Sequence, residues 1–434
     1  MIKKIIVKNA IIDAEKIRKK SKNNFSEDKV NKTKEIINDV EKFGDKAVLK
    51  YTSKFDGINL ESILVTKEEI EEAYNHVDKK QIKILKSIKN KISKNEKTLL
   101  RYFQKISAIR DDQITIQKII KPITSIGCYV PGGKARYPST LIMCAIPAKI
   151  AGVKRIVAIS PAQKNSKIDP LTLVAADICG INEFYKIGGA QGIAALAFGT
   201  KTIKKVDKIV GPGGMFVTIA KSVVSDRISI DMIAGPTELL VYADSFANPK
   251  YIAIDLISQA EHSEDTMCGL VTTSKEIAER VEKEILKILN RNIQRKEIIS
   301  KSLRENGFIA ICNSKEEVIN FVNEIAAEHL QIMSKNARKI INEINSAGLI
   351  LVGEHTPSAA SDYCFGSNHV LPTLGFGKSR SALSVLDFIK IVGVVQTTKN
   401  GLKDIASEME VITKNEGLVN HYEAIKYRIK KDYH

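Results

Sequence analysis

Aromatic side chains are scarce in this sequence: tryptophan is missing, and aromatic residues make up only 6% of the 434 positions. Proteins that bind single-stranded nucleic acid stack bases on aromatic side chains, and we find no stacking motif or DNA-reading module. The formal net charge of +17 nevertheless keeps a basic nucleic-acid-binding protein among the alternatives. Much of the excess is lysine in the first hundred residues, around a predicted apolar helical face of Leu85, Ile88 and Ile92. We therefore expect no nucleic-acid partner.

Cysteines are few, and none are spaced as a CxxC pair. Most of the six lie inside apolar runs, which favours reduced, buried thiols over disulfides or a zinc site made of thiolates. Apolar runs of membrane-spanning length are also lacking, because Lys149 and Lys154 interrupt the best candidate at residues 141–160. The N-terminus begins with lysines, but its apolar stretch is too short for a signal peptide. These features predict a cytoplasmic protein that does not associate with a membrane.

Hydrophobic periodicity predicts an α/β protein. The first 120 or so residues have mainly helical, polar patterns. From about residue 123, short β-like runs alternate with helical patterns, as in RIVAIS (155–160) and then DPLTLVAADICG (169–180). A second series runs from ELLVYAD (238–244) to GLILVGE (348–354). This alternation is typical of βαβ units, so we expect two related α/β domains with parallel sheets. The stretch after about residue 383 is too short for its own core and should pack on another surface, such as a second subunit.

Three glycine-rich turns adjoin predicted strands in the middle of the chain, at residues 131–133 (PGG), 188–192 (GGAQG) and 211–214 (GPGG). Glycine at a strand-to-helix turn lets the backbone approach a ligand, and a helix N-terminus favours phosphate. Neither the GxGxxG nor the GxxxxGK fingerprint is present. On these turns alone, tight turns in an α/β sheet remain the simpler interpretation, and a nucleotide-shaped ligand is the alternative.

A short polar segment, QAEHSEDT (259–266), follows a predicted helix. Gln259 and His262 lie three residues apart and would share one helical face, where both could bind a metal ion or simply face solvent. Two other segments offer further nitrogen and oxygen ligands, Asp362 in SAASDYCFGSNHVLPT and His421 in NEGLVNHYEAI. Together these four would suit zinc, with manganese or cobalt as alternatives. Their spacing does not prove that they converge.

Candidate acid and base groups lie near the same segments. Glu328 and His329 are adjacent, and such a pair could activate water and move a proton, since imidazole titrates near neutral pH. A surface pair on a helix is the alternative. His369 shares the loop of Asp362, and Glu416 lies five residues before His421. Polar groups in a loop rich in small residues suggest a binding site.

Taken together, eight segments in this order resemble the histidinol dehydrogenase family. They are YVPGGKARYPST, GGAQGIAALAFGT, VDKIVGPGG, AGPTELLV, QAEHSED, NEIAAEHLQI, SDYCFGSNHVLPT and EGLVNH. The resemblance covers the chain from about residue 120 to its end. It implies a zinc-dependent, NAD-linked, four-electron oxidation of L-histidinol through L-histidinaldehyde to L-histidine, the last steps of histidine biosynthesis.

The resemblance also implies a role for each candidate residue. The zinc ligands, one ion per subunit, would be Gln259, His262, Asp362 and His421. His329 would be the general base for the alcohol proton, and Glu328 would activate the water that hydrates the aldehyde. Thr237, His369 and Glu416 would contact substrate, together with the four ligands and His329. Tyr129, Gln191 and Gly214 would contact NAD. Gly214 stands where the family usually has Asn, and Thr237 where it usually has Ser.

The same resemblance implies the expected architecture, two incomplete Rossmann-like domains of aldehyde-dehydrogenase type and a small C-terminal extension. The expected division is 1–25 packing with the extension, 26–128 with 242–382 as the metal and catalytic domain, 129–241 as the NAD domain and 383–434 as the extension. The extension would pack on the partner subunit of a homodimer, so that His421 and Glu416 complete the neighbour's site. A zinc-dependent hydrolase on an α/β scaffold remains the alternative, because it too would use a metal, a Glu and a His.

Overall fold

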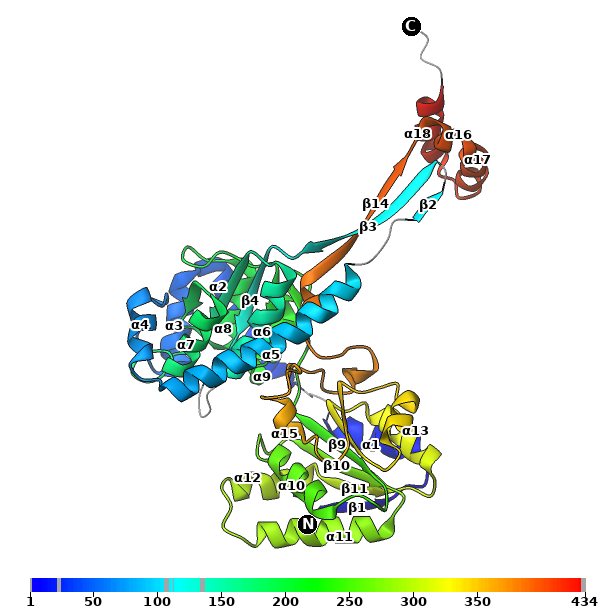
Figure 1. Cartoon of the computed structure of the whole chain (residues 1–434). Coiled ribbons are helices and arrows are strands. Elements are labelled where there is room, and N and C mark those ends of the chain that lie inside the picture. The colour runs from blue at the N-terminus through cyan, green and yellow to red at the C-terminus, as the bar shows by residue number, and fades with distance from the viewer. Residues whose placement is uncertain (1, 22–24, 105–108, 112, 133–136, 431–434) are drawn as a thin grey trace.

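The computed structural model describes residues 2–21, 25–104, 109–111, 113–132 and 137–430. Two lobes, each built on a parallel sheet, adjoin one another, and an arm projects from them (Figure 1). The predicted α/β class with two parallel sheets is confirmed. No helix in the described ranges is both long and apolar enough to cross a membrane.

The first lobe contains a five-stranded sheet in the order β6-β5-β4-β7-β8, with every neighbouring pair parallel. Its strands are β4 (Ser125–Tyr129), β5 (Arg155–Ile159), β6 (Glu183–Tyr185), β7 (Lys208–Val210) and β8 (Ser229–Ile230). Helices cover both faces, as the nearly continuous apolar strands require. One face packs on α4 (Lys67–Tyr74), α5 (Lys79–Phe103), α6 (Pro138–Ala151) and α7 (Pro170–Cys179). The other packs on α2 (Glu27–Phe43), α3 (Asp45–Asp56), α8 (Gly189–Phe198) and α9 (Met215–Val224).

The second lobe contains a six-stranded parallel sheet in the order β1-β11-β10-β9-β12-β13. Its strands are β1 (Lys3–Ile6), β9 (Glu238–Ala243), β10 (Met267–Thr272), β11 (Phe308–Ile311), β12 (His329–Met333) and β13 (Leu349–Val352). One face packs on α10 (Pro249–Ala260), α11 (Lys275–Leu289) and α12 (Lys296–Glu305). The other packs on α1 (Ala10–Ser21), α13 (Lys315–Ile325) and α14 (Ala337–Ile340). Four short elements follow β12, namely η1 (Ile341–Glu343), α15 (Ser358–Ser361), η2 (Phe376–Lys378) and η3 (Val385–Phe388).

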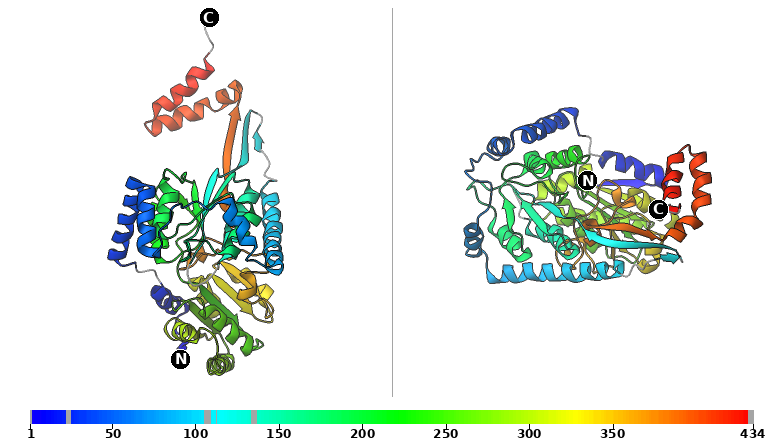
Figure 2. Two further views of the ribbon diagram at one scale, coloured as in Figure 1. Left: turned by 90° about the vertical axis from the view of Figure 1, so that its left-hand side faces the viewer. Right: turned by 90° about the horizontal axis from the view of Figure 1, so that it is seen from above.

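The arm is an antiparallel ribbon that ends in three helices and stands away from both lobes (Figures 1 and 2). It contains β2 (Ile109–Asp111), β3 (Ile114–Pro122), β14 (Ile389–Thr397), α16 (Lys399–Asp404), α17 (Ala406–Asn415) and α18 (Val419–Ile429). All residues from 391 to 400 are exposed, and among residues 399–430 only Gly401 and Thr413 are buried. The arm therefore has almost no core of its own within this chain.

The structure divides the N-terminal quarter of the chain differently from the expected domains. β1 pairs with β11, and α1 packs on the same lobe, so this segment lies far from the chain's own extension (Figures 1 and 2). Helices α2–α5 cover the five-stranded sheet and not the six-stranded one. The physical reason is that the apolar stripe containing Leu85, Ile88 and Ile92 packs on α6, the helix that directly follows β4.

Candidate active site

The candidate catalytic residues lie at the amino ends of neighbouring strands. Thr237 immediately precedes β9, His262 precedes β10, and Glu328 precedes β12, whose first residue is His329. The candidate coenzyme residues lie instead at the carboxyl ends of β4, β6 and β7. Because residues 231–237 connect the carboxyl end of β8 directly to the amino end of β9, these two sheet edges adjoin. The candidate catalytic and coenzyme residues therefore lie on sheet edges that are joined by a short connection.

Glu328 is buried, with 6% of its surface exposed, and it is held by two hydrogen bonds. The Thr237 hydroxyl donates to its Oε2 at 2.6 Å, and the backbone N–H of Glu238 donates to the same oxygen at 2.7 Å. Burial raises the pKa of Glu328 to about 7, although these donors and nearby His329 act in the opposite direction. A carboxyl group that titrates near neutral pH can exchange a proton with bound water.

His329 is also buried and lies between two carboxylates. Its Nδ1 is 3.8 Å from Glu328 Oε2 and 3.3 Å from the backbone oxygen of Glu238, and its Nε2 is 3.1 Å from Asp362 Oδ1. Burial alone would lower the pKa of His329, but Asp362 and Glu328 outweigh it and raise that pKa. Because the Glu238 carbonyl oxygen and the Asp362 carboxylate can only accept, both ring nitrogens donate when the ring is protonated, the form that the raised pKa favours.

The candidate metal ligands Gln259 and Asp362 join the same network. Gln259 Nε2 donates to Thr237 Oγ1 at 2.9 Å, and Gln259 Oε1 accepts from Ser358 at 3.3 Å. His262 is exposed, yet the protein around its ring lowers its pKa, with Asp362 acting in the opposite direction. The ring nitrogens of His262 donate and accept no hydrogen bond within the part of the chain that the structure describes.

The structure does not bring all four candidate ligands together within one chain. His421 lies at the exposed start of α18, at the far end of the arm, and Glu416 lies just before it. Accordingly, the described residues contain no group of three or more His, Cys, Asp or Glu side chains placed to hold a metal ion. Gln259, His262 and Asp362 belong to the lobes, so a fourth ligand would have to come from elsewhere.

The remaining substrate candidate, His369, connects the two lobes. Its Nδ1 lies 2.7 Å from the backbone oxygen of Asp362, and its Nε2 lies 3.1 Å from the hydroxyl of Thr140 in α6. Burial lowers the pKa of His369, although Asp362 acts in the opposite direction. Its ring therefore lies beside the candidate catalytic residues and is oriented by contacts at both nitrogens.

The three coenzyme candidates line adjacent turns of the five-stranded sheet. The hydroxyl of Tyr129 accepts a hydrogen bond from the backbone N–H of Gly189 at 3.2 Å. Gln191 is buried with 1% exposure, and its Oε1 has no hydrogen-bond partner within the described chain. Gly214 is exposed and caps the N-terminus of α9. The predicted PGG turn is only partly visible, because Gly133 lies outside the described residues.

The sequence analysis did not identify a buried ion pair that lies next to the candidate catalytic residue Glu328. Glu238, 1% exposed, forms an ion pair with Arg18 of α1 and accepts hydrogen bonds from the backbone of Leu374 (2.9 Å) and Glu328 (3.2 Å). The charged residue at the start of the apolar strand ELLVYA could have indicated such a pair, because a buried carboxylate needs a partner. The sequence could not identify Arg18, which lies 220 residues away.

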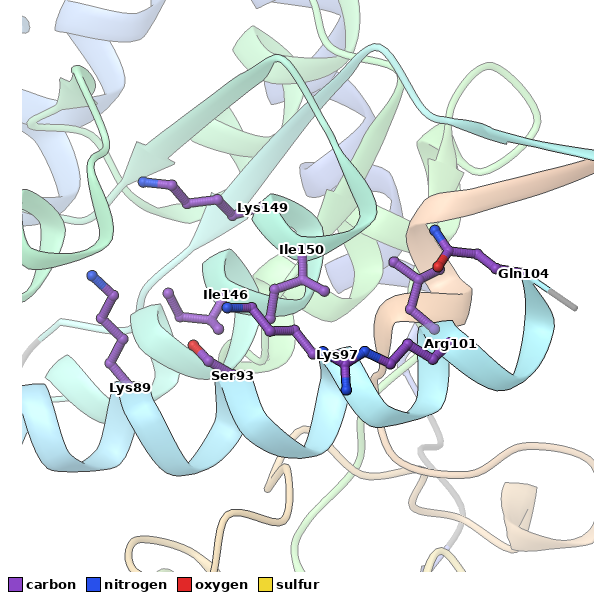
Figure 3. A pocket seen from close by; sticks show the side chains of 9 residues that line it. Lys89, Ser93, Lys97, Arg101, Gln104, Ile146, Lys149 and Ile150 are labelled. Atoms are coloured by element: carbon purple, nitrogen blue, oxygen red, sulfur yellow. The ribbon is translucent and has the colours of Figure 1, made fainter.

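The basic hollow between α5 and α6 is separate from these residues (Figure 3). It encloses about 450 Å³ and is lined by lysines 89, 97 and 149 and Arg101. Lys89 and Lys149 donate to backbone carbonyl oxygens of Ile178 and Cys179 at 2.7 and 2.8 Å. None of the candidate catalytic, metal or coenzyme residues lines this hollow, so its size does not identify the active site.

Comparison with known proteins agrees with the resemblance in sequence. A family model described as histidinol dehydrogenase matches residues 18–429. The histidinol dehydrogenases of Methanocaldococcus jannaschii and Clostridium acetobutylicum are each 43% identical, with 96% and 98% of this chain and 96% and 99% of theirs covered. The crystal structure of histidinol dehydrogenase from Elizabethkingia anophelis superimposes with a TM-score of 0.93 at 34% identity and covers 99% of this chain and 98% of its own. These similarities favour a dehydrogenase over a zinc-dependent hydrolase.

Proposed function

The chain belongs to the histidinol dehydrogenase family of NAD-dependent oxidoreductases, and we propose that its site is shared between two subunits and contains zinc. It oxidises L-histidinol through L-histidinaldehyde to L-histidine in histidine biosynthesis. One observation carries the assignment of the site residues. Hydrogen bonds connect Gln259 to Glu328 through Thr237, and another connects His329 to Asp362, so candidate metal ligands adjoin a candidate acid–base pair.

The chemistry of the candidate ligands fits zinc. Gln259 and Asp362 offer oxygen atoms, and the lowered pKa of His262 favours the neutral imidazole that a metal ligand requires. With His421 of the partner subunit, the set would contain two nitrogens and two oxygens, which suits zinc. Bound zinc would hold the amine and imidazole of the substrate. The remaining steps depend on the side chains of the lobes.

Proton transfer can be assigned to two side chains. In the first oxidation the alcohol proton passes to the neutral imidazole of His329 as hydride leaves for NAD, and Asp362, 3.1 Å from Nε2, stabilises the resulting imidazolium. Water then adds to the aldehyde carbon, with its proton passing to the carboxylate of Glu328. His329 again takes a proton as the hydrate gives its hydride to a second NAD. Two NAD molecules are reduced, and water supplies the second carboxylate oxygen.

The arm supports a homodimer. It projects away from the lobes (Figures 1 and 2), and its exposed apolar side chains need cover. These are Ile116, Ile391, Val392, Val394, Val395, Val411, Ile412, Leu418, Val419 and Tyr427. A second copy of the chain would bury them and would receive His421 and Glu416 in its own site. A cytoplasmic location is also proposed, in keeping with six cysteines that are all free thiols.

The direct test is NAD reduction with L-histidinol by the purified protein. The expected result is two NADH and one L-histidine per histidinol, measured by absorbance at ~340 nm and by amino-acid analysis. One NADH per histidinol with released aldehyde would contradict the four-electron reaction. No reduction at all, with zinc and NAD in excess, would contradict the proposed function.

Removal of one metal ligand should empty the zinc site. His262→Ala is expected to lower zinc affinity by more than about 100-fold, because it removes a nitrogen ligand directly. Zinc per subunit after dialysis, measured by mass spectrometry, gives the readout independently of activity. His76→Ala is the matched control, because His76 is exposed and lies outside the site. Equal zinc retention by both variants would show that His262 is not a ligand.

Restoring the usual Asn at position 214 should strengthen coenzyme binding. Gly214 has an extended conformation (φ −66°, ψ 175°), and an added Cβ would meet no atom within 4 Å. An Asn side chain would therefore fit, would cap α9 and could donate to NAD. We expect Gly214→Asn to lower the KM for NAD by about three- to tenfold, as one added hydrogen bond allows. An unchanged or higher KM for NAD would remove Gly214 from the coenzyme site.

A further inference from the structure

A buried ion pair lies behind the GPGG turn. Lys221 in α9 and Asp231 after β8 are 2% and 6% exposed, and Lys221 Nζ pairs with Asp231 Oδ1. Lys221 Nζ also donates to the backbone oxygen of Gly211 at 2.9 Å. Asp231 Oδ2 accepts from the backbone N–H of Gly211 at 2.7 Å, and Oδ1 accepts from that of Met232 at 2.6 Å. Both backbone polar groups of the first turn residue are thus held by charged side chains.

The position of Gly211 leaves little freedom for any other arrangement. Its φ is +110°, which L side chains rarely adopt, and an added Cβ would lie 2.2 Å from the backbone oxygen of Tyr129. The turn that follows β7 therefore packs closely against the carboxyl end of β4. Lys221 and Asp231 bind Gly211 from the buried side, and the following residues, 212–214, are partly or fully exposed.

Stability alone does not account for such a pair. Removing two charges from water is costly, and well-packed apolar side chains of similar volume often stabilise a fold as well or better. Buried ion pairs can instead specify one backbone conformation, and here the conformation specified is that of a ligand-facing turn.

The same pair is tied to the catalytic lobe. Arg380 donates a hydrogen bond to the backbone oxygen of Asp231. Arg380 follows η2, in the segment where the N–H of Leu374 donates to Glu238 beneath Glu328. One short segment therefore contacts both the pair behind the turn and the buried carboxylate beneath the catalytic glutamate.

We infer that Lys221 and Asp231 are positioning residues for the coenzyme, which hold the turn at 211–214 in the shape that receives NAD. This inference rests on the proposed assignment of that turn to NAD. Neither side chain needs to touch the coenzyme, because both act through the backbone of Gly211. Preorganisation of this kind improves affinity by reducing the ordering that binding requires.

The test is direct NAD binding by a variant in which the pair is neutral. Lys221→Met with Asp231→Asn removes both charges and the contact to the Gly211 oxygen, and it leaves no unpaired buried charge. We expect the Kd for NAD, measured by calorimetry, to rise about tenfold or more, since the turn must then be ordered on binding. The kcat at saturating NAD and the KM for histidinol should stay within about threefold of the wild-type values.

The matched control is another ion pair in the same sheet. Arg155 donates two hydrogen bonds of 2.8 Å to Glu183, at the amino ends of β5 and β6 and away from the turn. Arg155→Met with Glu183→Gln should leave the Kd for NAD unchanged. An equal rise in both double variants would overturn the inference, because general loosening of the lobe would then explain it.

A second variant covers the case in which the double variant does not fold. Asp231→Asn alone keeps the shape and an acceptor for the Gly211 N–H, and we expect it to raise the Kd for NAD by about threefold or more. A folded variant of either kind with wild-type Kd overturns the inference. Failure of the proposed function is distinguishable, because it shows as wild-type protein that binds NAD but does not oxidise histidinol.

Discussion

Replacing Glu328 by Gln should strongly slow aldehyde oxidation while the protein stays folded. The Gln amide oxygen can still accept from Thr237 and from the Glu238 N–H, so the local structure is retained. The amide cannot take a proton from water, and loss of general base catalysis typically costs about 10²- to 10⁴-fold in rate. We expect kcat with L-histidinaldehyde to fall by that factor and the first oxidation to fall less. Rapid-mixing kinetics of NADH formation separates the two steps.

The neighbouring residue gives a contrasting result. His329→Gln should slow both oxidations, because His329 accepts a proton in each. Glu324→Gln is the control, since Glu324 pairs with Lys378 at the surface and lies outside the network. Equal loss of both steps in Glu328→Gln and His329→Gln would contradict the separate roles. Wild-type aldehyde oxidation by Glu328→Gln would remove Glu328 from the mechanism.

The pH dependence provides an independent check on Glu328. Its pKa is raised to about 7 by burial, and only the ionised carboxylate can accept the proton of water. The kcat/KM for the aldehyde should therefore fall as pH decreases through about 7. The acidic limb that remains in Glu328→Gln should come from His329 alone, whose pKa is also raised from its usual value.

Strand patterns in the sequence were sufficient to predict two parallel sheets, but not which sheet each N-terminal helix covers. The stripe of Leu85, Ile88 and Ile92 marks one buried face of α5, and such a stripe is compatible with any apolar surface. The pairing of β1 with β11 joins segments about 300 residues apart. The sequence pattern of a four-residue strand does not indicate which other strand it pairs with. Long-range partners of this kind are fixed by the packed core.

The candidate site likewise contains some features that the sequence could predict and others that it could not. Glu328 and His329 could be recognised as a pair because they are adjacent in the chain. The contact of Thr237 with Glu328 spans 91 residues and exists because β9 and β12 are neighbours. The metal ligands were named from family resemblance and not from spacing, and their roles stay predictions. The buried partners Arg18, Lys221 and Asp231 carry no motif, so only the structure draws attention to them.

Mixing two impaired variants should restore the complete oxidation of histidinol to histidine if the site is shared between subunits. Glu328→Gln damages the lobes, whereas His421→Ala damages only the tip of the arm. In a mixed dimer, the lobes of the His421→Ala chain would receive an intact arm from the Glu328→Gln chain. Half of randomly assembled dimers are mixed, each with one intact site of two, so coexpression should give about a quarter of wild-type activity.

The matched control combines two variants whose substitutions both lie in the lobes. Glu328→Gln with Asp362→Asn leaves every site with one damaged lobe, whichever arm it receives, so no activity should return. If activity recovers only when Glu328→Gln is mixed with His421→Ala, the arm must reach the partner subunit. A site built within a single chain would keep one substitution in every copy and could not recover. Absence of recovery in both mixtures, with mixed dimers isolated by two affinity tags, would instead mean that His421 acts within its own chain. The arm would then have to fold back onto the lobes from which it now projects (Figure 1).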